Sequence, residues 1–189
     1  MALISFIEII NIVIAILGVG YIFTGMFPLR GSKKDILDSY TKGFDWSEFW
    51  FVCMVTAPAI ILHEMGHKFV AMYLGLSAFF QVSYFGLFLG IILKLLGTGF
   101  IILAPGYVII SGATTVQTIL SAFAGPFVNL LLWMIALLFL KNLRNMSRRQ
   151  AIYWNLTKNI NMWLFIFNML PLPFLDGAKI WIPLFHMFF

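Results

Sequence analysis

The chain has 189 residues, of which 62% are hydrophobic and 10% are charged, and its formal net charge is +5. A soluble domain carries about 25% charged residues, so this composition excludes an ordinary soluble domain and predicts an integral membrane protein that contacts the lipid bilayer. The positive charge lies in short loops, so we attribute it to the membrane surface and expect no nucleic-acid binding. The single cysteine, Cys53, excludes an internal disulfide and a cysteine-rich zinc site.

Two apolar segments, at 3–27 and 49–76, are each predicted to cross the bilayer as one helix, because about 20 apolar residues span its hydrocarbon core. The first segment lacks a basic leading region, so we expect a retained span rather than a cleaved signal peptide. The second segment contains His63-Glu64-Met65-Gly66-His67. Ionisable side chains are costly at membrane depth, so this pattern indicates a functional site.

The His63-Glu64-x-x-His67 pattern is typical of a zinc-binding helix. Residues four apart lie on the same face of a helix, so the two imidazoles can bind one Zn²⁺. Glu64 lies roughly 100° around the helix from His63, close enough to reach a water molecule at the metal. We therefore predict that His63 and His67 are metal ligands and that Glu64 is a catalytic base.

The region 77–112 is not typical of an ordinary span. Its apolar segment 85–96 is short and is interrupted by glycine and lysine. Two β-branched runs, 100–103 and 107–111, flank Ala104-Pro105-Gly106, a pattern that is typical of a hairpin. We predict a short re-entrant helix followed by a membrane-embedded β-hairpin, and a single irregular span is the alternative.

Two more spans are predicted, at 115–140 and 150–170. Ser147 and Gln150 have the spacing of a capping box, which should begin the second of these helices. The expected fold class is therefore an all-α polytopic membrane protein with about four transmembrane helices and the re-entrant, hairpin-containing region. We expect all of it to form a single domain, 1–189.

A catalytic zinc ion takes a third protein ligand, and Asp176 is the candidate. Apart from Glu64, the other acidic residues lie in the first loop or near the start of the first span. Pro171 and Pro173 prevent a helix from continuing towards Asp176, and Gly177 permits a sharp turn behind it. We predict that Asp176 projects from a rigid, non-helical segment into a polar cavity.

These motifs together resemble the site-2 protease family of intramembrane zinc metalloproteases. The resemblance rests on His63-Glu64-x-x-His67 and on Asn168-x-x-Pro-x-Pro-x-Leu-Asp176-Gly177, and Gly125-Pro126-x-x-Asn129 looks like a further motif of that family. The resemblance implies a core of three helices with a β-hairpin that helps to bind substrate. It also supports a catalytic role for Asn168, as a hydrogen-bond donor to the developing oxyanion.

The expected function is hydrolysis of peptide bonds in transmembrane segments of other membrane proteins, with Zn²⁺ as cofactor, in a multi-pass protein of the cell membrane. A substrate helix must unwind before cleavage, and the hairpin can bind the unwound strand by β-augmentation. We expect substrate contacts at Phe100, Gly106, Tyr107 and Asn129, although Asn129 also suits hydrogen bonding between helices. Two other functions stay open, a divalent-metal transporter or channel and a non-catalytic scaffold that binds membrane helices.

Overall fold

The computed structural model describes residues 3–27, 43–97, 105–142 and 145–188. Most of these residues are helical, and two short strands form a small sheet. The described helices are α1 (Phe6–Phe23), α3 (Trp46–Tyr73), α4 (Tyr84–Leu95), α5 (Thr115–Asn142), α6 (Arg148–Asn168) and α7 (Asp176–Phe188), and the strands are β1 (Ser77–Val82) and β2 (Gly106–Ser111).

Among the described helices, α1, α3 and α5 are long and apolar enough to cross a membrane. Their most apolar segments have mean hydropathies of 2.3, 1.5 and 2.2, and those of α1 and α5 are mostly unburied within the protein. Outward-facing apolar surface on this scale is what contact with lipid requires, so this is a membrane protein. Helix α6 covers the fourth predicted span but is not apolar enough to be grouped with these three, so that span stays a prediction.

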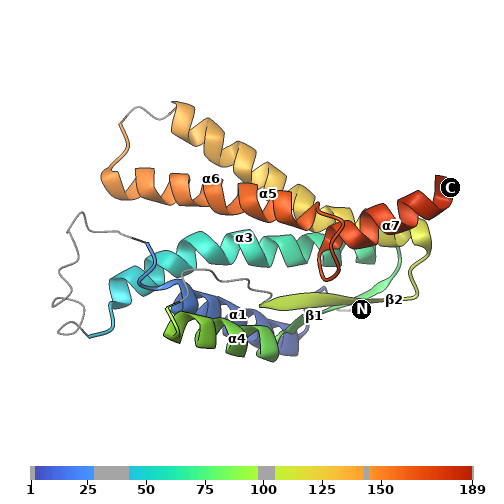
Figure 1. Ribbon diagram of the computed structural model, residues 1–189, viewed down its shortest axis with the longest axis horizontal. Coiled ribbons are helices and arrows are strands. Elements are labelled where there is room, and N and C mark those ends of the chain that lie inside the picture. Colours follow the sequence, from blue (N-terminus) through green and yellow to red (C-terminus); the bar gives the residue numbers. More distant parts are fainter. Residues whose placement is uncertain (1–2, 28–42, 98–104, 143–144, 189) are drawn as a thin grey trace.

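Helix α3 lies in the middle of the molecule, with α5 and α6 on one side and α1, α4 and the sheet on the other (Figure 1). It contacts α1, α5, α6 and both strands. This central position explains why α3 is the most buried of the three long apolar helices. Polar side chains in its second half are therefore held by neighbours on both sides.

Side chains at the N-termini explain where three of the helices begin. Ser5 and Glu8 form a capping box at the start of α1, and the Asp45 side chain accepts two backbone N–H groups at the start of α3. The capping box predicted from Ser147 and Gln150 is confirmed at the start of α6.

The sheet differs from the predicted hairpin. Strand β2 pairs antiparallel with β1, and α4, which confirms the predicted short helix, lies between them in sequence. Gly106 pairs with Val82 instead of lying in a turn, so the predicted position of the hairpin turn is wrong. The other predicted strand, 100–103, lies outside the described residues. Strand β1 was missed because only residues 74–76, which include no proline, separate its six residues from a long apolar helix.

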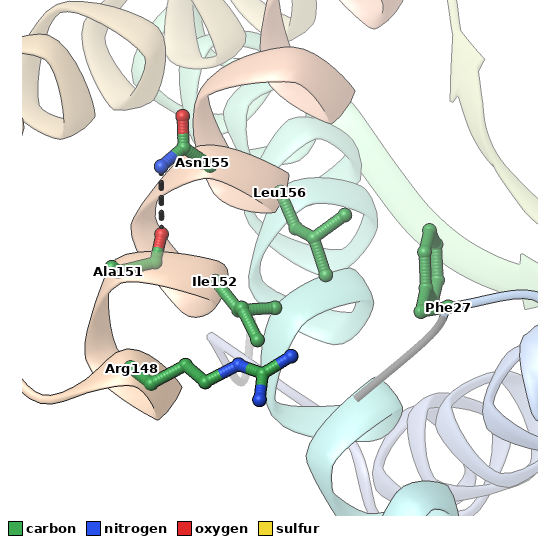
Figure 2. Close-up of a pocket in the computed structure, with 6 residues that line it drawn as sticks. All are labelled: Phe27, Arg148, Ala151, Ile152, Asn155 and Leu156. Atoms are coloured by element: carbon green, nitrogen blue, oxygen red, sulfur yellow. Dashed lines mark hydrogen bonds between the residues drawn. The ribbon is translucent and has the colours of Figure 1, made fainter. Parts of the chain in front are cut away.

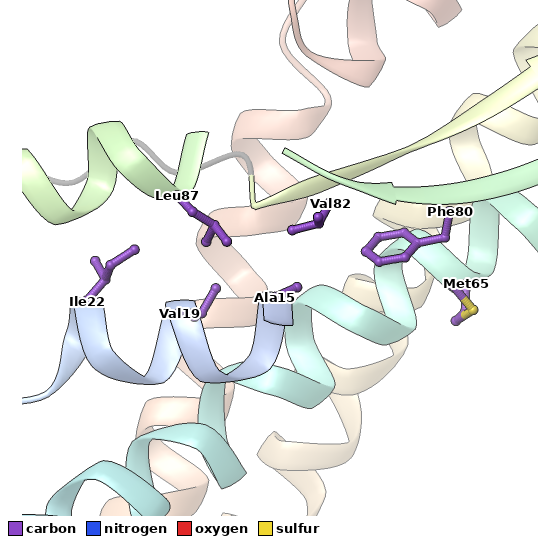
Figure 3. Packing of buried hydrophobic residues seen from close by; sticks show 7 residues of the cluster. All are labelled: Ala15, Val19, Ile22, Met65, Phe80, Val82 and Leu87. Carbon is purple, nitrogen blue, oxygen red and sulfur yellow. The ribbon is translucent and has the colours of Figure 1, made fainter. Parts of the chain in front are cut away.

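Close packing, rather than a turn, explains the glycine at position 106. A Cβ atom at Gly106 would lie 2.6 Å from the ring of Phe80 in the paired strand. Phe80 is completely buried in a cluster that joins the sheet to α1, α3 and α4 (Figure 3). The cluster consists of Ala15, Val19, Ile22, Met65, Phe80, Val82 and Leu87. It fixes the sheet beside the helix that carries the two histidines.

Candidate metal centre

Three side chains converge where α3 meets the start of α7. The Nε2 atoms of His63 and His67 lie 3.1 Å apart, and each lies 3.1 Å from Oδ2 of Asp176. All three residues are more than 90% buried. The structure therefore brings together the three residues that the sequence predicted as metal ligands, from positions more than 100 residues apart.

Asp176 is the first residue of α7, so the prediction that it belongs to a non-helical segment is wrong by one residue. The connection from α6 to α7 is short and ends at Leu175. Gly177 is required by a close approach, because a Cβ atom there would overlap the carbonyl group of Leu170. The other carboxylate oxygen, Oδ1, lies 3.7 Å from the ammonium group of Lys179, which sequence reasoning did not single out.

The second ring nitrogen of His67 fixes the tautomer of its neutral imidazole. Its Nδ1 atom lies 2.7 Å from the backbone oxygen of Ser121 in α5. A carbonyl oxygen only accepts hydrogen bonds, so Nδ1 carries a proton, and in the neutral imidazole Nε2 is then the nitrogen that presents a lone pair. This arrangement is the one that a metal-binding histidine uses, with its outer nitrogen held by a backbone carbonyl.

His63 is fixed in the same tautomer by Asn129, through a chain of amide hydrogen bonds. The Asn129 amide nitrogen donates to the oxygen of Ala59 at 2.9 Å and to Oδ1 of Asn161 at 2.8 Å. Its Oδ1 is therefore the acceptor for Nδ1–H of His63, at 2.6 Å. Asn161 in turn donates to the oxygen of Thr157 at 2.8 Å, so α3, α5 and α6 all contribute to the orientation of one imidazole.

This geometry corrects the expected role of Asn129. Its side chain is completely buried and its amide group is occupied by His63, Ala59 and Asn161, so it does not offer a surface for substrate. The structure shows the alternative role, in which Asn129 forms hydrogen bonds between helices.

The donor set fits a zinc ion. Two imidazole nitrogens and a carboxylate oxygen face one another at 3.1 Å, an arrangement that needs a proton or a metal cation among these atoms. A tetrahedral zinc site with bonds of about 2.0–2.1 Å has its ligand atoms about 3.3 Å apart. Two histidines and one carboxylate are also a standard ligand set for catalytic zinc, which keeps a fourth position open.

Gly125 gives the two imidazoles their space. It faces the metal site from α5, four residues before Asn129, and a Cβ atom there would overlap the His67 ring and lie 2.8 Å from Nε2 of His63. The sequence marked Gly125 only as part of a motif, and the structure supplies the physical reason for a glycine.

A cavity of about 530 Å³ opens from this centre. Glu64 and Asn168, the two predicted catalytic residues, line it together with the three metal-site residues. Gly106 and Tyr107, two of the predicted substrate contacts, lie in the wall that β2 provides. Phe100, the third, lies outside the described residues.

The connection between α6 and α7 supplies the rim of the same cavity. Phe174 lines the cavity, is fully exposed and has a positive φ of 75°, which is unusual for an aromatic residue.

A second hollow, of about 320 Å³, lies at the opposite end of α6, where Arg148 and Asn155 lie beside the apolar side chains of Phe27, Ile152 and Leu156 (Figure 2). The described residues that line it include no histidine, cysteine or carboxylate.

A comparison with known proteins agrees with this centre. A protein from Methanocaldococcus jannaschii is 32% identical over 183 residues, and the match covers 93% of this chain and 85% of that protein. That protein is named "Putative zinc metalloprotease". The chain belongs to the same family of zinc metalloproteases. No protein-family model and no solved structure matches this metalloprotease.

In this metalloprotease, replacement of Asn129 by leucine is expected to weaken zinc binding about 10–100-fold, the usual cost of removing a group that orients a metal ligand. A leucine side chain at this position cannot accept the hydrogen bond from His63, so the imidazole loses its fixed tautomer and orientation. Competition with a calibrated zinc chelator measures the affinity. Asn155→Leu, on an exposed face of α6, is the control and should leave the affinity unchanged; equal affinities in both variants would contradict the assigned role.

Proposed function

We propose that the chain is an intramembrane zinc endopeptidase, similar to the site-2 proteases, that cleaves transmembrane segments of other membrane proteins. The observation that carries this proposal is the position of the buried ligand set. His63 and His67 lie past the middle of α3, a 28-residue helix that is long and apolar enough to cross a membrane. A metalloprotease whose ligands lie within such a helix is suited to substrates that are themselves within the bilayer.

Each polar residue of the cavity has a place in the proposed reaction. His63, His67 and Asp176 would hold the zinc ion, which when bound polarises a peptide carbonyl and makes hydroxide available near neutral pH. Glu64 takes a proton from the attacking water and then gives it to the leaving amine. Asn168, the last residue of α6, donates a hydrogen bond to the developing oxyanion, a contact worth about 3 kcal/mol in a well-organised site.

The outer edge of β2 is proposed to bind the unwound substrate strand. The Ser83 N–H donates to the oxygen of Pro105, and hydrogen-bonded pairs alternate along an antiparallel ladder. Gly106, Val108 and Ile110 are therefore the residues whose backbone N–H and C=O groups point away from β1. All three line the cavity beside the metal centre, so a strand added here would run past the reactive groups.

This proposal implies a multi-pass protein of the cell membrane, with a single-span membrane protein as its substrate. The α-helical form of that substrate hides its carbonyl groups in its own hydrogen bonds, so local unwinding must precede the reaction. Backbone hydrogen bonds offered by β2 replace those that the substrate loses, which is necessary where water is scarce.

Removal and return of the metal test the proposed function. The purified protein in lipid vesicles is expected to contain one zinc ion per chain and to cleave a co-reconstituted single-span substrate within its membrane segment. Chelation should abolish cleavage, and added zinc should restore it. Elemental analysis gives the stoichiometry, and mass spectrometry of the products gives the cut site.

Three results would contradict the proposal. Cleavage that survives complete removal of zinc would exclude a metal-dependent reaction. Zinc flux across the vesicle membrane without cleavage would favour a transporter. Substrate binding with neither cleavage nor flux would favour a non-catalytic scaffold.

A further inference from the structure

A second polar cluster, outside the metal centre, joins α1 to α3. Glu8 of α1 and Lys68 of α3 form an ion pair, and their side chains are only 3% and 1% exposed. Burial of two charges costs free energy even when they are paired, and ionisable groups in membrane segments usually serve a function. Neither residue lines the metal cavity, so the proposed reaction does not explain the pair.

Glu8 binds the backbone of β1 as well as Lys68. Its Oε1 atom accepts a hydrogen bond from the N–H of Phe80 at 2.8 Å, and its Oε2 atom accepts one from the N–H of Ser5 at 2.8 Å. Asn11, about one turn further along α1, donates from its amide nitrogen to the oxygen of Phe80 at 3.2 Å. Side chains of α1 thus satisfy both backbone polar groups of Phe80, as a neighbouring strand would.

These contacts close one edge of the sheet, and no strand among the described residues pairs with the other edge. Phe80 pairs with Val108, and both of its backbone polar groups point to α1, so those of Val108 point the opposite way. Val108 lies in the wall of the metal cavity. The hydrogen bonds from α1 therefore fix the position of β1 relative to α1. The hydrogen bonds between β1 and β2 in turn fix the position of the outer edge of β2.

Lys68 connects this arrangement to the metal centre. It directly follows His67, and its ammonium group bonds to the same Glu8 oxygen that accepts the Phe80 N–H. One carboxylate oxygen therefore ties the strand to the helix that carries the histidines, one residue beyond a metal ligand.

We infer that Glu8, with Lys68 as its counter-ion, is a positioning residue that aligns the substrate-binding edge of β2 with the metal centre. The inference rests on the proposed function, because it assumes that substrate binds to this edge as a strand. Glu8 acts through Phe80 and β2 without touching substrate. Its loss should therefore weaken substrate binding while leaving the zinc ligands and the chemical step in place.

Two double variants separate this role from that of a merely stabilising ion pair. Glu8→Gln with Lys68→Met removes both charges but keeps an oxygen that accepts the Phe80 N–H. Glu8→Met with Lys68→Met removes the charges and also the acceptor. Replacement of a buried ion pair by apolar residues is often neutral for stability, so both proteins should fold.

The measurements are zinc content, kcat and KM for the single-span substrate, with wild-type cleavage established first. We expect all variants to bind zinc like the wild type. The KM of the glutamine variant should stay within about threefold of wild type, and that of the methionine variant should rise about tenfold, the effect of one well-placed hydrogen bond. The kcat of both should change little.

Glu48→Gln is the matched control. Glu48 also joins α3 to α1, by accepting the N–H of Gly25, but at the end of α1 remote from the strand, so its KM should not change. If the methionine variant loses zinc, Asn11→Leu decides, because it removes only the donor to the Phe80 oxygen and should still raise KM. An unchanged KM in the methionine variant would overturn the inference; if that variant has lost zinc, an unchanged KM in Asn11→Leu would do so. Absence of cleavage by the wild type would instead refute the proposed function.

Discussion

Replacement of Glu64 by glutamine is expected to lower kcat for cleavage about 100–10,000-fold while zinc stays bound at one ion per chain. This range is the usual contribution of a positioned general acid–base group. Glutamine has nearly the same shape as glutamate but cannot take a proton from water. Glu64 lines the cavity without belonging to the converging ligand set, so the metal centre should remain intact.

Single-turnover cleavage and elemental analysis on the same preparation check this result. Glu48→Gln introduces the same chemical change on the same helix, outside the cavity, and should cleave at the wild-type rate. Full activity in Glu64→Gln would remove Glu64 as the base. Loss of zinc together with activity would instead assign Glu64 to the ligand set.

Replacement of Gly125 by alanine is expected to reduce zinc affinity more than 100-fold and to abolish cleavage without unfolding the protein. The added methyl group would occupy the space of the His67 ring and crowd Nε2 of His63. The imidazoles can rotate away, so the backbone is not forced apart and the cost in stability is small. Rotation breaks the convergence of the three ligand atoms, so the loss should exceed the 10–100-fold effect of removing an orienting group.

Chelator competition measures the zinc affinity, and thermal unfolding in detergent measures the stability. Gly43→Ala is the matched control, because a Cβ atom at Gly43 would meet nothing within 4 Å. Wild-type zinc affinity in Gly125→Ala would show that the imidazoles do not occupy the positions that the structure gives them.

The metal ligands could be predicted from the sequence because helical geometry alone places His63 and His67 on one face. Asp176 could be predicted by elimination, since few other carboxylates lie in apolar surroundings. The start of α7 at Asp176 could not, because two nearby prolines indicate only where a helix stops. The residue at which the next helix begins depends on tertiary packing, here that of Gly177 against Leu170.

The roles of Asn129 and Gly125 depend on tertiary structure, so spacing could not reveal them. Asn129 meets His63 across 66 positions and Asn161 across 32, contacts that arise only when α3, α5 and α6 are packed. A signal for the Glu8–Lys68 pair was present, since each is a charged residue in an apolar segment and two such charges of opposite sign favour pairing. The pairing of β2 with β1 could not be predicted, because α4 separates the strands.

The separate origins of the three ligands have a consequence for how the protein tolerates metal depletion. His63 and His67 belong to the central helix, which is packed on both sides, whereas Asp176 begins α7, which rests on α5 at one end of the molecule. A bound ion therefore acts as a cross-link between an internal helix and a peripheral one, and it closes a loop of more than 100 residues. Without the ion that cross-link is absent, so we expect α7 to detach more readily than the helices packed around α3.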